Sequence, residues 1–265
     1  MADTAQPGAQ ESFISHLVEL RNRLVKASIA VLIVFAILFL IWPGPAMIYD
    51  FLARPMMDSL PAGAKMIATG ITTPFLIPMK LTLLVALVLA LPWVLYQVWA
   101  FIAPGLYAHE KRLVAPLVVS SSLLFMAGVA FCYFLVFGKV FKFINEFSPK
   151  SITVAPDIEN YFDFVMTMCL AFGVTFEVPI VVIVLVRMGL VTVEKLKSIR
   201  PYVIVGAFVV AAVVTPPDVM SQLFLAIPLC LLFEVGLLLA PLFARVTKAP
   251  DTDAGADADT PQSQH

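Results

Sequence analysis

Six long apolar runs, separated by short polar stretches, take up most of this chain, and they decide the solvent in which it folds. The run 81–102 has 22 residues, and only Thr82, Pro92 and Gln97 interrupt it. At about 1.5 Å per helical residue it covers the roughly 30 Å hydrocarbon core of a bilayer. Backbone polar groups in lipid must be satisfied within their own segment, so runs of this length are helices. The sequence therefore predicts an all-α, polytopic membrane protein.

The predicted domain organisation is one membrane domain over 13–244, between disordered polar tails at 1–12 and 245–265. The fifth apolar run has only 13 residues, fewer than an ordinary span needs. If it crosses, the bilayer thins locally or the sixth run also sits shallow; otherwise the two form a re-entrant pair. The six predicted spans are 24–42, 75–102, 113–138, 162–186, 202–214 and 219–244.

Basic residues set the predicted orientation, because short loops rich in Lys and Arg stay on the cytoplasmic side. With the N-terminus inside, 11 of the 17 Lys and Arg residues fall on cytoplasmic segments. Both termini are therefore predicted to be cytoplasmic. The outer loops, 43–74 and 139–161, are long, and together they could cap the outer face.

Several functional classes are disfavoured by what the sequence lacks. A net charge of −1 gives no reason to expect nucleic acid as a partner. No Gly-rich phosphate loop or hydrolase motif is present, so we expect neither ATP hydrolysis nor other enzyme activity. We expect no cofactor and no metal. The three cysteines lie inside apolar runs and are interpreted as small buried hydrophobic residues: Cys132, Cys169 and Cys230.

Two carboxylates are predicted at the cytoplasmic face. Residues 13–24 have helical apolar spacing and are predicted to form an amphipathic helix that lies in the interface and runs into the first span. Glu19 on this helix either pairs with Arg23 four residues later or receives a cationic ligand. Glu110, beside Lys111, either stabilises the start of a helix through the helix dipole or, like Glu19, receives a cationic ligand. Each carboxylate can take a guanidinium in bidentate geometry.

Inside the membrane, Glu177 and Glu234 are costly, so both are functional candidates. The structural alternative is a neutral carboxyl bonded to a backbone carbonyl. Glu177 lies 10 residues before Arg187, about 15 Å along the helix, and we expect it to face the concave side. Pro179 is predicted to kink this span. At the outer corner, Asp218 is placed to cap span six, and it forms a polar cluster with Thr215 and Gln222 that could bond to another helix.

These segments, taken together and in order, resemble the TatC family, the multispanning receptor subunits of the twin-arginine protein translocase. The resemblance extends from residue 16 to about residue 235 and leaves out only the tails. Each motif is weak alone, but the ordered set is highly specific. The motifs lie at His16–Leu24, Gln97–Tyr107 with Glu110 and Arg112, Phe176–Pro179, Arg200–Tyr202 and Thr215–Asp218 with Ser221 and Gln222.

The resemblance implies six spans in a concave, glove-like wall with short fifth and sixth helices, in the bacterial inner membrane. It implies binding of twin-arginine signal peptides of folded cargo at the cytoplasmic face. It also implies self-association, single-span TatB-like and TatA-like partners, and transport driven by the proton gradient. By motif match, Glu19 and Glu110 take the arginine pair, while Leu20, Arg21 and Phe101 shape the site. Further matches are Pro55 and Tyr133, where substitution impairs transport, and the polar positions Glu177, Thr215, Asp218 and Gln222.

A proton-coupled secondary transporter is the alternative, with Glu177 as its proton relay. Such a transporter typically has paired broken helices and substrate ligands near the midplane. Here the candidate binding groups lie at the surface, and the only predicted broken region is the short fifth run. The sequence therefore favours a receptor.

Overall fold

The computed structural model describes residues 7–60, 65–102, 114–147, 155–215 and 218–243, and most of these residues are helical. Five stretches of the described chain are long and apolar enough to cross a membrane, and a sixth apolar helix, α9, is shorter. The long helices are α1 (Pro7–Leu40), α3 (Thr73–Ile102), α4 (Val114–Phe131) with the π-helical η3 (Cys132–Val136) and α5 (Phe137–Phe147), α6 (Ile158–Phe176) with α7 (Val178–Arg187), and α10 (Val219–Phe243). The shorter helices are α2 (Pro45–Met57), α8 (Val193–Ser198) and α9 (Arg200–Val214).

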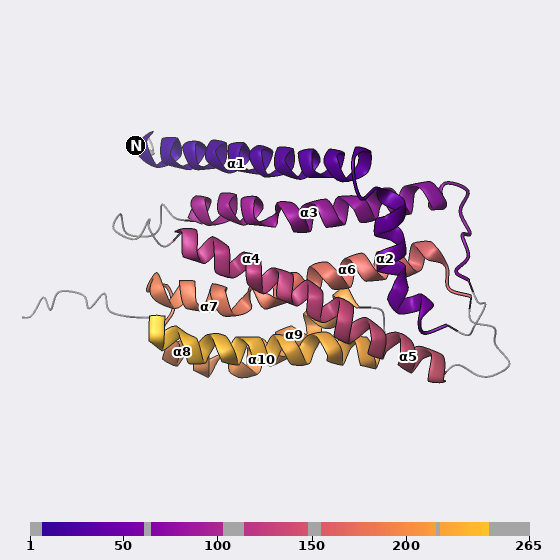
Figure 1. Cartoon of the computed structure of the whole chain (residues 1–265). Helices are drawn as coiled ribbons and strands as arrows, with labels where there is room; N and C mark the ends of the chain where they lie inside the picture. The colour runs from indigo at the N-terminus through magenta and orange to yellow at the C-terminus, as the bar shows by residue number, and fades with distance from the viewer. Residues whose placement is uncertain (1–6, 61–64, 103–113, 148–154, 216–217, 244–265) are drawn as a thin grey trace, which may run out of the picture.

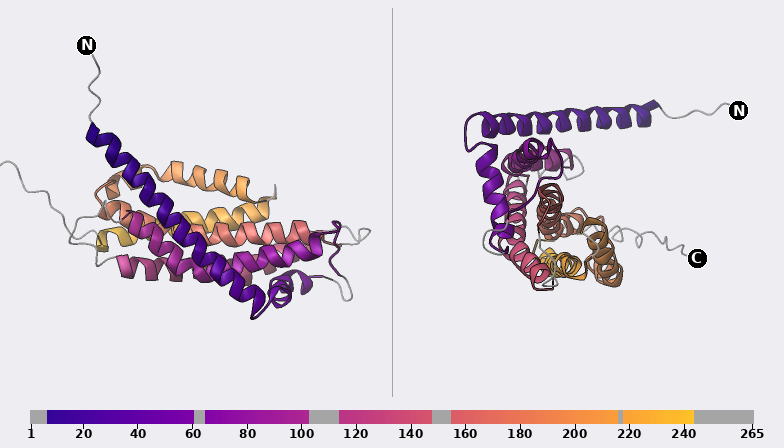
Figure 2. Two further views of the ribbon diagram at one scale, coloured as in Figure 1. Left: turned by 90° about the horizontal axis from the view of Figure 1, so that it is seen from above. Right: turned by 90° about the vertical axis from the view of Figure 1, so that its right-hand side faces the viewer.

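Apart from α1, the long helices lie side by side, with α2 across the predicted outer end and α8 at the predicted cytoplasmic end (Figure 1). Where these helices are seen end-on they follow an open curve that ends at α9, and α1 crosses its other limit obliquely (Figure 2). A hollow of about 590 Å³ is lined by residues of α1, α3 and α6. The predicted all-helical, concave architecture is confirmed.

Helix α1 differs from the prediction at its start. It begins at Pro7, inside the segment predicted as a tail, and continues without a break through Leu40. Its 34 residues extend about 51 Å along the helix axis. Residues 13–24 run into the span without a break, as predicted, and Figure 2 shows the whole helix crossing the others obliquely. The position of residues 13–24 at the membrane interface stays a prediction.

The outer segments contain more helix than the sequence indicated. The loop predicted over 43–74 contains α2, and the helix of the third span continues to Phe147, beyond its predicted end at 138. The fifth helix is short, as predicted, with 15 residues. The sixth, α10, has 25 residues, enough to cross unaided, so the prediction of a short sixth helix is wrong. The tail predicted over 245–265 lies outside the described residues.

Two glycines let α4 and α6 approach closely. A Cβ at Gly128 would lie 2.5 Å from the backbone oxygen of Phe172, and one at Gly173 would lie 2.4 Å from the Phe125 ring. Small residues at such crossings are typical of packing between membrane helices, where close backbone approach replaces the hydrophobic driving force. This close crossing holds α4 against α6, and both helices carry or adjoin candidate site residues.

Asp157 fastens the outer segment before α3 to the start of α6. One carboxylate oxygen accepts the amide and hydroxyl of Thr69 at 3.2 and 2.7 Å, and the other caps α6 through the amides of Glu159 and Asn160. The Thr69 hydroxyl, with these amides, holds the pKa of Asp157 below its usual range. The carboxylate therefore stays ionised and the cap stays formed at neutral pH.

Candidate functional site

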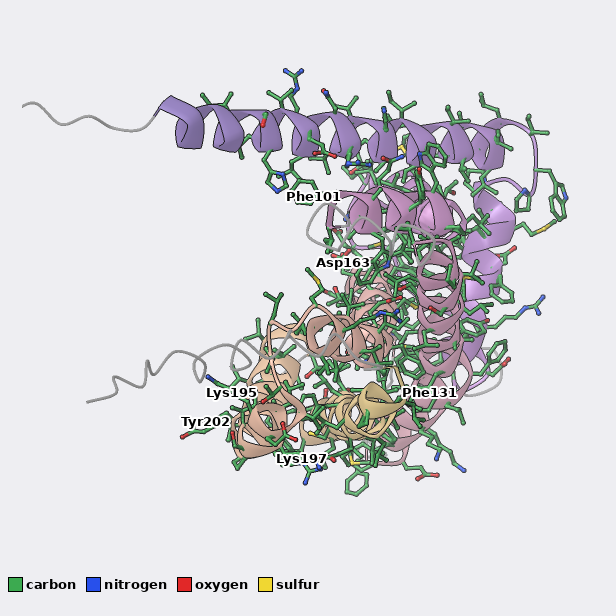
Figure 3. All side chains as sticks on the ribbon, turned by 90° about the vertical axis from the view of Figure 1, so that its left-hand side faces the viewer. Phe101, Phe131, Asp163, Lys195, Lys197 and Tyr202 are labelled. Carbon is green, nitrogen blue, oxygen red and sulfur yellow. The ribbon has the colours of Figure 1, made fainter. Side chains whose placement is uncertain are left out.

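The predicted cytoplasmic site joins α1 to the end of α3. The His16 ring stacks on the Phe101 ring with centroids 4.4 Å apart, and Phe101 lies beneath α1 in Figure 3. The two residues are 85 positions apart, so only the fold brings their motifs together. Sequence reasoning missed His16 as a site residue, although it opens the first motif.

Glu19 is already engaged by a cation of its own helix. Arg23 donates to Glu19 Oε1 from Nε at 2.9 Å and from Nη2 at 2.6 Å. The pairing predicted from i,i+4 spacing is thus confirmed, and it holds the carboxylate in one orientation. Leu20 and Arg21 are exposed, and Phe101 is half-buried. Glu110, the other predicted carboxylate, lies outside the described residues.

Glu177 lies at the break between α6 and α7. Pro179 is the second residue of α7, and the predicted interruption of this span is confirmed. Both Glu177 carboxyl oxygens are buried and have no hydrogen-bond partner among the described residues. The carboxyl is therefore enclosed by protein, and the expectation that it faces the concave side stays a prediction.

A tryptophan and a serine lie between the cytoplasmic motif and Glu177. The Trp99 indole donates to the buried Ser121 hydroxyl at 3.1 Å, and Ser121 lies close enough to the Glu177 carboxyl to interact with it. Trp99 also packs with Ile180 of α7. Sequence reasoning missed Ser121, because three consecutive serines on an apolar helix give no sign of which one points inward.

The outer-corner cluster makes its bonds within the chain. Thr215 donates to the Ala211 carbonyl at 2.8 Å, and Asp218 accepts the Ser221 amide at 2.7 Å, which confirms the predicted cap. The Gln222 amide donates to the Phe208 carbonyl of α9 at 3.2 Å. Gln222 therefore links the two helices on either side of the corner.

Glu234 pairs with Arg200, the first residue of the Arg200–Tyr202 motif, for which the sequence predicted no partner. Arg200 Nη2, at the first residue of α9, lies 2.7 Å from Glu234 Oε2 of α10. A spacing of 34 residues gives no signal for this pair. It explains how a carboxylate is accommodated within an apolar helix, since an intramembrane charge needs a partner.

Pro55 and Tyr133 belong to one outer-face arrangement. Proline has no N–H, so Pro55 leaves the carbonyl of Phe51, four residues earlier, without its helical donor. The Tyr133 hydroxyl donates to that carbonyl at 2.6 Å, and its ring stacks on Phe51 at 4.8 Å. The hydroxyl of Tyr161 donates to the next carbonyl, Leu52, at 2.9 Å. The kinked α2 is thereby held on the wall.

Replacing Tyr133 by Phe should lower the free energy of unfolding by about 0.5–1.5 kcal/mol, because it removes the replacement donor to Phe51. Pro55→Ala restores the backbone donor, so Tyr133→Phe should cost less in the Pro55→Ala background. Thermal unfolding of the four detergent-purified proteins measures this coupling. Tyr202→Phe, at a residue 78% exposed, is the matched control. Strictly additive effects would contradict the arrangement.

Among the described residues, no group of three or more His, Cys, Asp or Glu side chains is placed to hold a metal ion. The polar groups at the candidate sites are carboxylates, guanidiniums, hydroxyls and amides, and groups of these kinds can bind and orient a ligand.

Comparisons with known proteins agree with the earlier resemblance. A family model described as Sec-independent protein translocase protein (TatC) matches residues 15–228. The protein of that name from Haemophilus influenzae is 51% identical over 241 residues, 91% of this chain and 91% of its own. The one from Escherichia coli K12 is 50% identical over 226 residues, 85% and 86% of the two chains. A crystal structure of the twin-arginine translocase receptor TatC matches with a TM-score of 0.76 and 41% identity, over 87% of this chain and 100% of that one.

Proposed function

This chain belongs to the TatC family of Sec-independent protein translocases, and from that premise we propose how its own residues perform the receptor's work. It is a multi-pass membrane component of the twin-arginine translocase. We place both termini in the cytoplasm of a bacterial inner membrane, as the basic residues indicate. The alternative of a proton-coupled transporter finds no support in the comparisons.

The proposed signal-peptide site lies where α1 meets the end of α3. The stacking of His16 on Phe101 is the observation that carries this proposal, because it unites two motifs that are distant in sequence. Glu19 supplies one carboxylate, orientated by Arg23, and Glu110 supplies the other. Leu20 and Arg21 shape its rim. Two carboxylates suit two adjacent guanidiniums, each able to form a bidentate pair.

The proposed partner site lies on α9. Four apolar residues with helical spacing are widely exposed on this helix: Tyr202 78%, Val205 64%, Val209 57% and Val213 81%. We name these four residues the α9 stripe. A single-span TatB-like or TatA-like helix laid along it would cover this stripe and reach the corner at Thr215 and Gln222. We further propose that copies of the chain associate with one another and that the proton gradient drives transport.

Export of a folded reporter tests the proposed function. The chain should restore export of a twin-arginine reporter in bacteria that lack their own TatC but keep the single-span subunits. A twin-lysine reporter should be exported far less, because an ammonium lacks the planar fork of a guanidinium. Equal export of the two reporters, or no export of either with the chain present in the membrane, would refute the proposal.

A further inference from the structure

The fully buried side chains by which helix α9 contacts the rest of the protein are small. Helix α9 packs mainly on α10, and its buried residues are two alanines one turn apart, Ala207 and Ala211. Larger side chains normally fix how far one helix has slid along another, since ridges interlock with grooves. Alanines supply little of that interlocking, and the larger α9 side chains that pack on the core, Val203 and Val214, are only partly buried. Packing alone therefore leaves the axial position of α9 weakly determined.

Two polar links supply what the packing lacks. At the inner end, Arg200 and Glu234 form the 2.7 Å ion pair; further out, Gln222 near the start of α10 donates to the carbonyl of Phe208, in the middle of α9. The outer link is a neutral bond to a carbonyl. The inner link joins two charges on half-exposed side chains, and removing either partner leaves an unpaired charge on an apolar helix. The ion pair is therefore the stronger of the two.

The depth of the pair links it to the short fifth helix. Glu234 lies nine residues before Phe243, the last described residue of α10, so it is about 14 Å from that end. Helix α9 begins at Arg200, at the level of Glu234 and not at the end of α10. The inner part of α10 contacts α8 instead, whose Leu196 is buried among Phe233, Leu237 and Ala240.

We propose that Arg200 and Glu234 form a depth lock: the pair sets how far α9 is inserted relative to α10 and so holds the α9 stripe at the height that a partner helix requires. A slip by one helical turn would displace the stripe by about 5.4 Å. This role of the ion pair rests on the proposed partner site on α9. Arg200 and Glu234 act as positioning residues, and neither needs to touch the partner.

The decisive variant removes both charges together. Arg200→Met with Glu234→Leu leaves no unpaired charge, so the protein should fold, because the two side chains are 43% and 42% exposed and even buried ion pairs can often be replaced by apolar residues without loss of stability. This double variant lacks, however, the ion pair that sets the depth of α9. A photo-crosslinking amino acid in place of Val209 reports which residues of a co-expressed TatB-like partner lie opposite α9. In the parent, crosslinks should fall within about one helical turn of the partner; in the double variant they should spread or shift by about one turn.

Two further proteins complete the experiment. The charge exchange Arg200→Glu with Glu234→Arg should restore the parental pattern, and the apolar double variant should recover about five-fold less partner on co-purification. The control is Lys80→Met with Asp163→Leu, which removes an ion pair of 3.4 Å between α3 and α6 and should leave the pattern unchanged.

Each outcome is informative. A folded apolar double variant with the parental crosslinks and partner yield would overturn the depth lock while leaving the partner site intact. Absence of crosslinks from Val209 in the parent itself would overturn the partner site, and the depth lock with it. A spread pattern that the charge exchange does not narrow would overturn the lock as well, because the two residues would then matter separately and not as a pair.

Discussion

Glu177→Ala should abolish export of a folded twin-arginine reporter, whereas Glu177→Gln should retain much of it. The carboxyl is enclosed at the α6–α7 break beside Ser121, with no hydrogen-bond partner among the described residues. A polar group in such a place is expensive unless it binds something during the cycle. Gln keeps a donor and an acceptor, while Ala has neither. Export assays of the two variants, at matched membrane levels, measure the difference.

Two serines provide the controls for Glu177. Ser121→Ala should reduce export partially, because it removes the hydroxyl beside the carboxyl and the acceptor of Trp99. Ser122→Ala should have no effect, since that hydroxyl bonds to the Val118 carbonyl of its own helix. If the Glu177→Gln variant exports as little as the Glu177→Ala variant, a proton relay replaces hydrogen bonding as the role. Full export by Glu177→Ala would refute both roles.

Glu110→Ala should weaken binding of a twin-arginine signal peptide by about 1.5–3 kcal/mol, the range for a hydrogen bond to a charged group. Glu19→Ala should weaken it less. An arriving guanidinium at Glu19 must share the carboxylate with Arg23, which already bonds to it at 2.6 Å, so the net gain on binding is smaller. Photo-crosslinking of labelled peptide to membranes measures both losses. Parental crosslinking by Glu110→Ala would remove that residue from the site.

Hydropathy predicted the architecture well, because the length of an apolar run is a property of local sequence. The spans around 75–102 and 219–244 were predicted within a few residues. The start of α1 at Pro7 was not, because the first dozen residues are polar and carry no helical apolar pattern. Helix α2 was missed because its interruptions by Asp50, Arg54 and Pro55 suggested a loop.

The sequence singled out candidate site residues one by one, but not the groups that they contact in the structure. The Pro55–Tyr133 arrangement depends on a carbonyl at Phe51 that becomes available only because of a proline four residues later. The partner of Glu234 on α10 is Arg200, at the start of the preceding helix α9. The stack of His16 on Phe101 likewise joins segments that only the fold brings together. Sequence patterns indicate which residues are costly, whereas long-range contacts decide what each one bonds to.

Recognition of the arginine pair can be measured as binding of a labelled twin-arginine signal peptide to the purified chain, with the same peptide carrying two lysines as the control. We predict saturable binding of the arginine peptide, and weaker binding of the lysine peptide by about ten-fold or more, since an ammonium cannot form the bidentate pair with a carboxylate. Glu110→Ala should reduce the difference in affinity between the two peptides. Equal affinity of the parent for both peptides would contradict recognition of arginine pairs by carboxylates.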